Sequence, residues 1–502
     1  MIHTSHRLKK ASAYDWKSRQ LKKFNADRNA YGANKKMKNT QTKIYSGLFL
    51  FGVASLLSKT YGADTSAVDS DSAAWQKPVW LTDLALGAKE SYDDNLLGVS
   101  GHGLAPKSSW VSTVSPKVGF NFAPLLGNQK TLQTLSLIYS PDFNFYHDDP
   151  SQSYYAHKIG DTIKGQAGDF SFSLDNAFLY NDGDHQAPIY ALNQLSGASA
   201  NQFDQYRNNY AHAVARERLA QTQDRATVRL QYDWDKFFVR PVASLLDYNL
   251  MTDWHNTGVA PWKGYQNYVD RYDVNGGMDL GYKLTPKLAA TLGYRYGSQY
   301  QQQFPTAITS DSHYSSSDYQ RVLLGLEGKL WNWLDVKLAG GPDFRNYNSM
   351  APVNDHNPVK YYGEAVLTAT ITTNQTVTFN YKQWQWVSST GKVPYLDSTY
   401  ALTYHWNASK QLGLDLGGKV LEADYTEGNE VNPTGQNSSL RDDMEYEVSA
   451  GVTYAFNSHL SANLAYTYDL GDNALNNLPA SLGPAYRGFE HQVVSLGLQY
   501  KF

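Results

Sequence analysis

The feature that most constrains this chain is a two-residue alternation of apolar and polar side chains, which recurs in long segments from Leu81 to the C-terminus. Ranges 226–234, 272–283, 288–296 and 444–456 each carry apolar residues at every second position. Successive side chains of a strand point to opposite faces, so each range has one apolar face and one polar face. The alternation therefore predicts β-strands and not amphipathic helices, whose period is 3.6 residues.

The lengths and ends of these segments predict strands that cross a bilayer. The segments run for about 10–15 residues, whereas globular strands average about 5–6 and a tilted membrane strand needs about 9–11. Aromatic residues such as Tyr232 and Trp234 lie at the ends of the apolar face, as expected at membrane interfaces. Short connections such as Asp235-Lys236 alternate with long ones such as 182–222. We therefore expect an all-β fold: a closed antiparallel transmembrane β-barrel of about 18 strands (roughly 16–20) in residues 81–502.

Composition excludes several other classes of protein. The chain has no Cys, so disulfide scaffolds, thiolate zinc sites, iron–sulfur clusters and a Cys nucleophile are ruled out. No apolar run after residue 60 approaches the roughly 18 residues of a spanning helix, which excludes a polytopic helical membrane protein. The 13 His residues form no metal-binding pair, and no nucleophile elbow, phosphate loop or dinucleotide fingerprint stands out. We therefore expect no enzyme activity, no cofactor and no metal.

The N-terminal segments read as an export signal preceded by an extra stretch. From Met37, a short basic segment leads into an apolar run over 44–57, and small residues surround a cleavage point after Gly62. This pattern predicts a signal peptide over 37–62, with an uncleaved anchor or a buried helix as alternatives. Residues 1–36 are basic and fit either a start codon assigned too early or a cytoplasmic tail. Residues 63–80 are predicted to be a short periplasmic lead-in.

Removal of the signal would change the charge balance of the chain. Residues 1–62 hold 13 of the 44 Lys and Arg and 2 of the 47 Asp and Glu. The remaining 31 basic and 45 acidic residues leave a net charge of −14. Nucleic-acid binding requires a basic face, so the sequence argues against a nucleic-acid partner. The charge fits an exported protein with a solvated surface.

The polar faces of the predicted strands would line an aqueous lumen, because about eighteen strands enclose a channel. Charged residues at inward positions are candidates for the pore lining. They are Arg271, Arg295, Arg321, Arg345, Lys382, Glu445, Glu447 and Asp469. The four Arg residues fall on neighbouring strands, and the three acidic residues fall on the opposite wall. Such facing strips would set up a transverse field that selects permeants. The alternative is that lumen positions simply tolerate charge, with Asp273 and Asp343 neutralising the Arg residues as ordinary ion pairs.

Two further patterns allow a functional and a structural interpretation. Trp384 and Trp386 share the inward parity of Lys382, so they either line a carbohydrate path or serve as interfacial anchors or packing under a loop. His147, Asp148 and Asp149 could hold a calcium ion through oxygen ligands, although an acidic loop tip is usually just solvated.

The last strand carries a terminal aromatic residue. Val494, Leu496, Leu498 and Tyr500 share one face with Phe502, the last residue of the chain. This arrangement resembles the C-terminal signal that outer-membrane barrels present to the barrel-insertion machinery. Phe502 is therefore the predicted insertion signal; the alternative is an ordinary strand that happens to be last.

Two stretches resemble the second β-barrel porin family of bacterial outer-membrane proteins. They are residues 88–96 (AKESYDDNL) and 139–149 (YSPDFNFYHDD), and the rest of 81–502 matches only in pattern. The resemblance implies a bacterial outer-membrane barrel with a porin-like role and no catalytic motif. We therefore expect a channel for passive diffusion of small hydrophilic solutes, with outer-membrane lipid and the insertion machinery as partners and a homo-oligomer left open. The alternative is a non-conducting structural, adhesion or polysaccharide-export barrel whose lumen is plugged by 182–222.

Overall fold

The structure is a computed structural model that describes residues 77–96, 107–127, 130–150, 153–184, 219–249, 270–302, 315–349, 351, 353–387, 394–424, 442–473 and 489–502. Every described residue belongs to one compact unit, Lys77–Phe502. Among the described residues, no helix has the length and apolar character needed to cross a membrane. The segments predicted over 1–36 and 37–62, and most of 63–80, lie outside the described residues and stay predictions.

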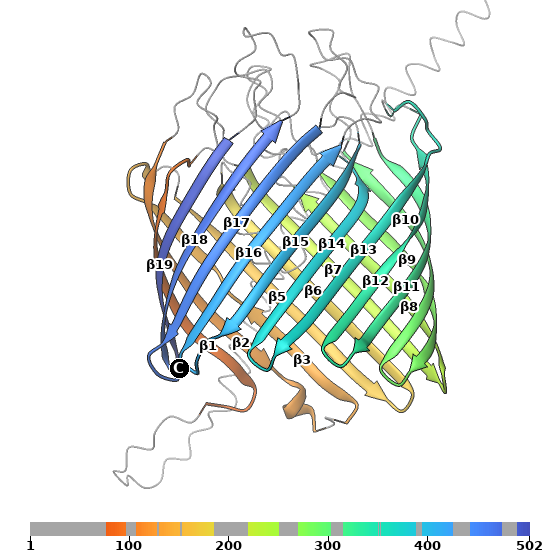
Figure 1. Ribbon diagram of the computed structural model, residues 1–502, viewed down its shortest axis with the longest axis horizontal. Helices are drawn as coiled ribbons and strands as arrows, with labels where there is room; N and C mark the ends of the chain where they lie inside the picture. Colours follow the sequence, from red (N-terminus) through yellow and green to blue (C-terminus); the bar gives the residue numbers. More distant parts are fainter. Residues whose placement is uncertain are drawn as a thin grey trace, which may run out of the picture. The chain divides into compact units, whose positions relative to one another are not determined.

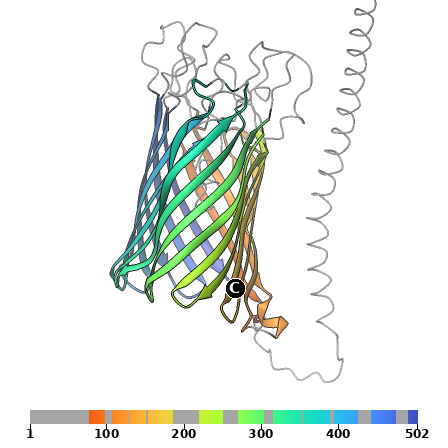
Figure 2. The ribbon, with the colours of Figure 1, turned by 90° about the vertical axis from the view of Figure 1, so that its right-hand side faces the viewer.

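The described part of the chain is built from strands that tilt strongly against the barrel axis (Figures 1 and 2). The strands are β1 Leu81–Asp93, β2 Ser109–Asn121, β3 Leu132–Tyr139, β4 Asp142–Tyr146, β5 Tyr154–Ala167, β6 Phe170–Asp184, β7 Leu219–Trp234, β8 Phe237–Asn249, β9 Arg271–Thr285, β10 Leu288–Gln301, β11 Ser317–Trp331, β12 Leu334–Tyr347, β13 Val359–Thr372, β14 Gln375–Trp386, β15 Tyr395–Asn407, β16 Leu412–Asp424, β17 Asp442–Ala455, β18 Leu460–Asn473 and β19 Phe489–Lys501. One short 3₁₀ helix, η1, spans Ala123–Leu126.

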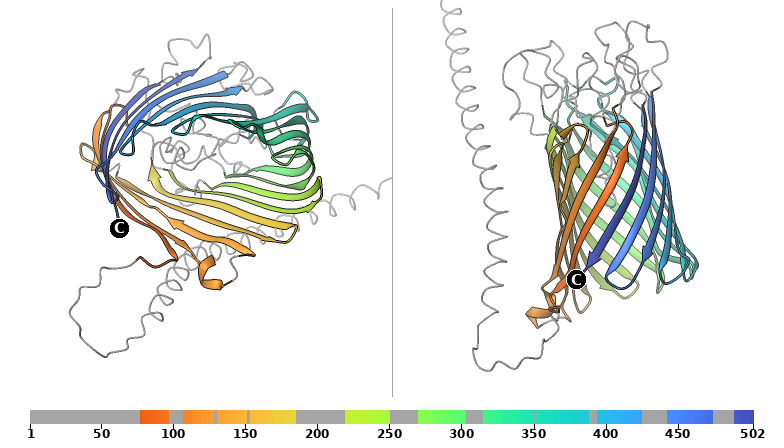
Figure 3. Two further views of the ribbon diagram at one scale, coloured as in Figure 1. Left: turned by 60° about the horizontal axis from the view of Figure 1, so that its bottom comes forward. Right: turned by 90° about the vertical axis from the view of Figure 1, so that its left-hand side faces the viewer.

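Each strand pairs antiparallel with its neighbours, and β1 pairs with β19, so the sheet closes into a ring (Figure 3). Both β3 and β4 pair with β2 on one side and with β5 on the other. They are two halves of one position in the ring, so the nineteen strands fill eighteen positions. The prediction of a closed antiparallel barrel of about 18 strands is confirmed.

The break between β3 and β4 falls at Ser140 and Pro141. Pro141 stands between the two halves and has no backbone N–H to donate to the ladder. Elsewhere the short turns follow the prediction. Trp234 ends β7 and Phe237 begins β8, and Asp235 between them has a φ of 52°. Two-residue hairpins favour such positive φ values.

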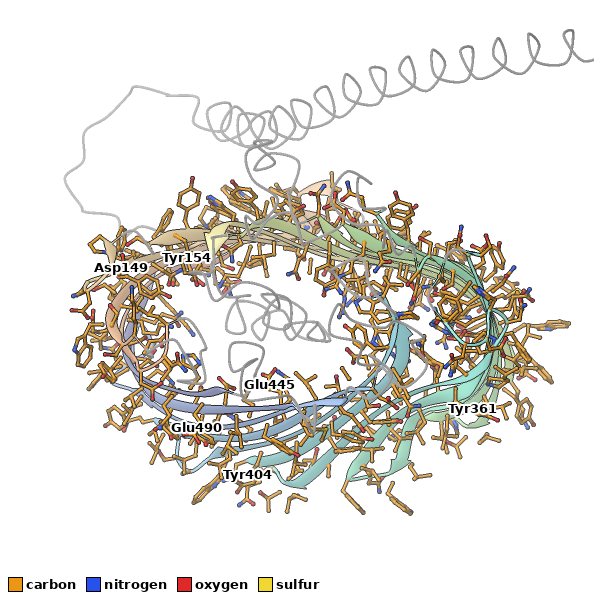
Figure 4. The ribbon with its side chains drawn as sticks, turned by 90° about the horizontal axis from the view of Figure 1, so that it is seen from above. Asp149, Tyr154, Tyr361, Tyr404, Glu445 and Glu490 are labelled. Atoms are coloured by element: carbon orange, nitrogen blue, oxygen red, sulfur yellow. The ribbon has the colours of Figure 1, made fainter. Side chains whose placement is uncertain are left out.

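Polarity is distributed inside out relative to a soluble protein. Large apolar side chains such as Leu324, Leu402 and Val448 are exposed on the outer face, whereas charged side chains such as Asp343 and Glu445 are buried on the inner face. Figure 4 shows Glu445 on the inside of the ring and Tyr361 and Tyr404 on the outside. Soluble proteins rarely expose such a large apolar surface to water. The outer face is therefore the lipid-facing belt of a membrane barrel.

Candidate functional site: the inner wall of the barrel

The register of the strands brings all eight predicted charged residues to the inner face. Arg295 pairs with Arg321, Arg321 pairs with Asp343, and Glu447 pairs with Asp469 in the cross-strand ladders. Residues directly opposite each other in adjacent strands share one face of the sheet. The four Arg residues lie on β9–β12 and the three acidic residues on β17 and β18, which are separate stretches of the ring.

Two of the four Arg residues share one buried carboxylate. Asp343 accepts a hydrogen bond from Nε of Arg321 at 2.8 Å and another from Nη2 of Arg345 at 3.0 Å. The guanidinium of Arg321 also lies over the rings of Tyr319 and Tyr362, at 4.0 and 4.5 Å from their centroids. The Asp343 side chain is 1% exposed and the Arg345 side chain 0%. Both guanidiniums are therefore held within the wall and are not presented to the open lumen.

Arg271 and Arg345 bind the backbone of a strand that is not their neighbour. Nη1 of Arg271 donates to the carbonyl of Val387 at 2.8 Å. Nη2 of Arg345 and Nε2 of Gln299 donate to the carbonyl of Gln385 at 3.1 and 2.8 Å. The residues that donate come from β9, β12 and β10, whereas Gln385 lies in β14 and Val387 directly follows it. The C-terminal end of β14 is thus held by side chains of β9, β10 and β12.

A buried aromatic cluster accompanies these hydrogen bonds. It consists of Tyr248, Trp384, Trp386, Val387, Tyr395 and Ala423. The rings of Trp384 and Trp386 stack at 4.4 Å, and Trp386 meets Tyr248 at 6.2 Å. Tyr248 lies on β8, six ring positions from β14, which is about 29 Å along a sheet with strands about 4.8 Å apart. The contact therefore requires the wall from β8 to β14 to fold back on itself, and side chains fill this part of the ring in Figure 4.

The two Trp residues and Lys382 form part of this packing. Nζ of Lys382 lies 3.9 Å from the centroid of the Trp384 ring. Trp384 is 3% and Trp386 0% exposed, so neither ring offers a free face on which a sugar could stack. Their burial matches the structural interpretation, packing against other side chains, and not a carbohydrate path.

Arg295 belongs to a second charged network on the same wall. Its Nη2 lies 2.7 Å from Asp279, and Asp279 also accepts from Nε of Arg240 at 3.0 Å. The guanidinium of Arg240 makes two parallel hydrogen bonds with Glu327, at 2.7 and 2.8 Å. Such bidentate pairs are geometrically specific. Arg240 on β8 and Glu327 on β11 lie three ring positions apart, so they meet only because the wall curves sharply here.

The acidic residues of the opposite wall lie close together. Ligand oxygens of Glu445, Glu447 and Asp469 lie within 4.8 Å of one another. Glu447 accepts from Nζ of Lys419 at 3.1 Å, and Asp469 lies 3.5 Å from Nδ1 of His491. His491 in turn pairs with Asp93 at 2.9 Å. The acidic strip is therefore interleaved with basic partners and continues onto β1.

Several inward charges were not singled out from the sequence. Lys89 on β1, Lys164 on β5 and Arg229 on β7 face inward by register, and the latter two have side chains 51% and 40% exposed. Their inward parity was readable from the sequence. What the sequence did not show is that they stay exposed while the Arg residues of β9–β12 become buried.

The acidic tip after β4 makes ordinary contacts. Asp148 accepts from the backbone N–H of Trp110 at 3.3 Å, and Asp149 lies 3.9 Å from Lys107. His147 lies 2.8 Å from the hydroxyl of Ser112. These contacts fit a solvated loop tip and add nothing in favour of calcium.

Comparisons with known proteins give only a general likeness. No protein-family model matches the chain, and no curated protein sequence is significantly similar to it. Among solved structures, the outer membrane protein OpdK from Pseudomonas aeruginosa has a TM-score of 0.39 and 9% identity, over 84% of this chain and 99% of that one. The siderophore receptor PirA from Acinetobacter baumannii has a TM-score of 0.38 and 10% identity, over 84% of this chain and 81% of that one.

OccAB3 from Acinetobacter baumannii is similar at a TM-score of 0.36 and 10% identity, over 84% of this chain and 99% of that one. With all three TM-scores below 0.5, nothing about function is transferred from these proteins. The architecture itself is informative, because closed antiparallel barrels with an apolar outer belt are the outer-membrane class. The fold therefore places the chain in a bacterial outer membrane.

Proposed function

We propose that this barrel is a porin-like channel through which small hydrophilic solutes diffuse passively across the outer membrane. The observation that carries the proposal is the closed ring of eighteen positions with an apolar outer face and a polar, charged inner face. Rings of this size are too wide to be filled by one layer of side chains and leave an aqueous channel. Membership of the second β-barrel porin family, supported by residues 88–96 and 139–149, is part of the same proposal.

The inner charges would set the preference of such a channel. Arg295 and Glu447 are the members of the predicted strips whose side chains keep some exposure, 14% each. Each has a local partner, Asp279 or Lys419, so the transverse field between the strips would be weaker than the sequence alone suggests. The substitutions Arg295→Gln and Glu447→Gln should therefore shift ion selectivity only modestly, in opposite directions.

One observation favours the alternative, a non-conducting structural, adhesion or export barrel. The cluster of Trp384, Trp386 and Tyr248 occupies space inside the ring that an open pore would leave to water. A barrel in which such packing extended across the whole lumen would not conduct.

Conductance in a planar bilayer separates the two functions. The protein is purified in its folded form from outer membranes, and ion selectivity is measured under a salt gradient. Steady conductance steps would support the channel. A barrel that remains heat-modifiable on gels, and is therefore folded, but never conducts would contradict it.

A further inference from the structure

We propose that the C-terminal end of β14 is a fixed internal partition that closes the part of the lumen lined by β9–β13. The partition consists of Trp384, Gln385, Trp386 and Val387. It confines permeating solutes to the part of the lumen lined by β15–β19 and β1–β8. The inference rests on the proposed channel function and specifies which wall of the barrel touches the solute.

The first observation is that the C-terminal end of β14 separates from the neighbouring strand β13. The β13–β14 ladder stops at the pair Gly363 and Gln383. The β14–β15 ladder continues to Trp386 and Tyr395. On the other side of β13, pairing with β12 continues through Tyr362 to Val359. The last residues of β14 therefore separate from β13 while they remain part of the sheet with β15.

The second observation is what these residues contact after they separate. Their carbonyls accept hydrogen bonds from Arg271, Gln299 and Arg345, which lie on β9, β10 and β12. The Trp386 ring packs on Tyr248 of β8 and lies 5.4 Å from the guanidinium of Arg271. Three strands thus supply side-chain donors to the carbonyls of Gln385 and Val387, which lie beyond the β13–β14 ladder.

The third observation is that the enclosed charged side chains are buried and contact one another. Behind the partition lie Tyr319, Arg321 and Asp343, which are 1%, 5% and 1% exposed. Charged groups at such burial are held by partners and cannot rearrange for a passing solute. The β14 partition therefore turns three members of the predicted basic strip, Arg271, Arg321 and Arg345, into a structural core. Exposed inward charges such as Lys164 and Arg229 take over as candidates for solute contact.

The test uses the absence of Cys in the chain, which makes single-cysteine variants unambiguous. Ser317→Cys is placed behind the partition, where Ser317 is 5% exposed and lies 3.2 Å from Nη1 of Arg345. Ser449→Cys, at an inward and partly exposed position of β17, is the matched control. Both exchanges conserve size. The folded barrel in detergent is treated with a charged methanethiosulfonate, and each rate is divided by the rate in the urea-unfolded protein.

The expected result is that the thiol introduced by Ser317→Cys reacts about 100-fold more slowly in the folded barrel than the thiol introduced by Ser449→Cys. Adding Trp386→Ala to Ser317→Cys should raise its reaction rate at least about tenfold and enlarge the conductance step, because the partition loses its anchor. The control Trp110→Ala removes a lipid-facing Trp that is 50% exposed and should change neither. Heat-modifiability on gels shows that each variant is folded.

Fast reaction of both thiols, at equal rates in the parent barrel, would overturn the partition. If both thiols react slowly and the barrel does not conduct, the open channel is refuted, and the partition is judged from the Trp386→Ala background. If Trp386→Ala does not increase the reaction rate of the Ser317→Cys thiol, the partition is overturned. An increase confined to Ser317→Cys would support it even without conduction.

Discussion

Asp343→Asn is the substitution that tests the buried charge cluster most sharply. The Asp343 carboxylate is 1% exposed and bridges Arg321 and Arg345 at 2.8 and 3.0 Å. Asparagine keeps the size of the side chain and one acceptor oxygen but removes the negative charge. Two buried guanidiniums would then face each other across a neutral amide. Both now donate to Oδ2 of Asp343, and an amide oxygen at that place can still accept from both, but no negative charge compensates them.

The expected loss of stability in Asp343→Asn follows from the burial of the Arg321–Asp343–Arg345 cluster. Breaking a buried ion pair by removing one partner costs about 3–5 kcal/mol, because an uncompensated charge stays out of water. Asparagine can retain both hydrogen bonds and loses only the charge, so we expect a loss at the lower end of this range, about 3 kcal/mol in the free energy of unfolding. The matched control is Asp335→Asn. Asp335 pairs with Lys329 at 2.7 Å, but the two side chains are 46% and 41% exposed. Such surface pairs contribute about 0–1 kcal/mol.

The assay is urea unfolding of both variants in lipid vesicles, followed by Trp fluorescence and by the gel shift of the folded barrel. Asp343→Asn should lower the midpoint clearly without changing the slope, and Asp335→Asn should leave it nearly unchanged. A difference of less than about 1 kcal/mol between the two variants would mean that the Arg321–Asp343–Arg345 cluster is hydrated and not buried as described.

Two further substitutions test the wall and the terminus. Gly277→Ala should destabilise the barrel by about 1–3 kcal/mol in the same urea assay, because a Cβ there would collide with the carbonyl oxygen of Tyr294. The control Gly418→Ala has open space at its Cβ and should be neutral. Equal effects of the two substitutions would contradict the close approach of the backbone at Gly277. Phe502→Ser should reduce the amount of folded barrel in cells while leaving refolding in vitro unchanged. The control is Phe456→Ser, because both Phe rings are about half exposed and pack edge-on against a Tyr. If both variants assemble equally well in cells, Phe502 is not the insertion signal.

The global fold could be read from the sequence because lipid imposes a simple rule on every strand. Apolar residues at alternate positions of ranges such as 288–296 and 444–456 must face the bilayer, so the register, the inner face and the approximate strand number follow from the pattern alone. Inward parity also identified all eight predicted charged residues as facing the lumen side. The break at Pro141 had a local signal too, the missing N–H of proline.

What the sequence could not show is which part of the inner face stays open. The departure of β14 from β13 after Gln383 depends on contacts between Trp386 and Tyr248 across the ring, and neither residue signals the other locally. Likewise, an alternating pattern says that Arg345 faces inward but not that its side chain becomes fully buried. Burial of an inward residue is decided by the curvature of the wall, which is a tertiary property.

The central claim, that the barrel is a channel, is tested most directly by single-channel recording of the purified folded protein in a planar bilayer. We predict steady conductance steps whose ion selectivity shifts toward cations in Arg229→Gln, since Arg229 is an exposed inward charge. A folded, heat-modifiable barrel that inserts into the bilayer and never conducts would contradict the claim and would favour the structural or export role.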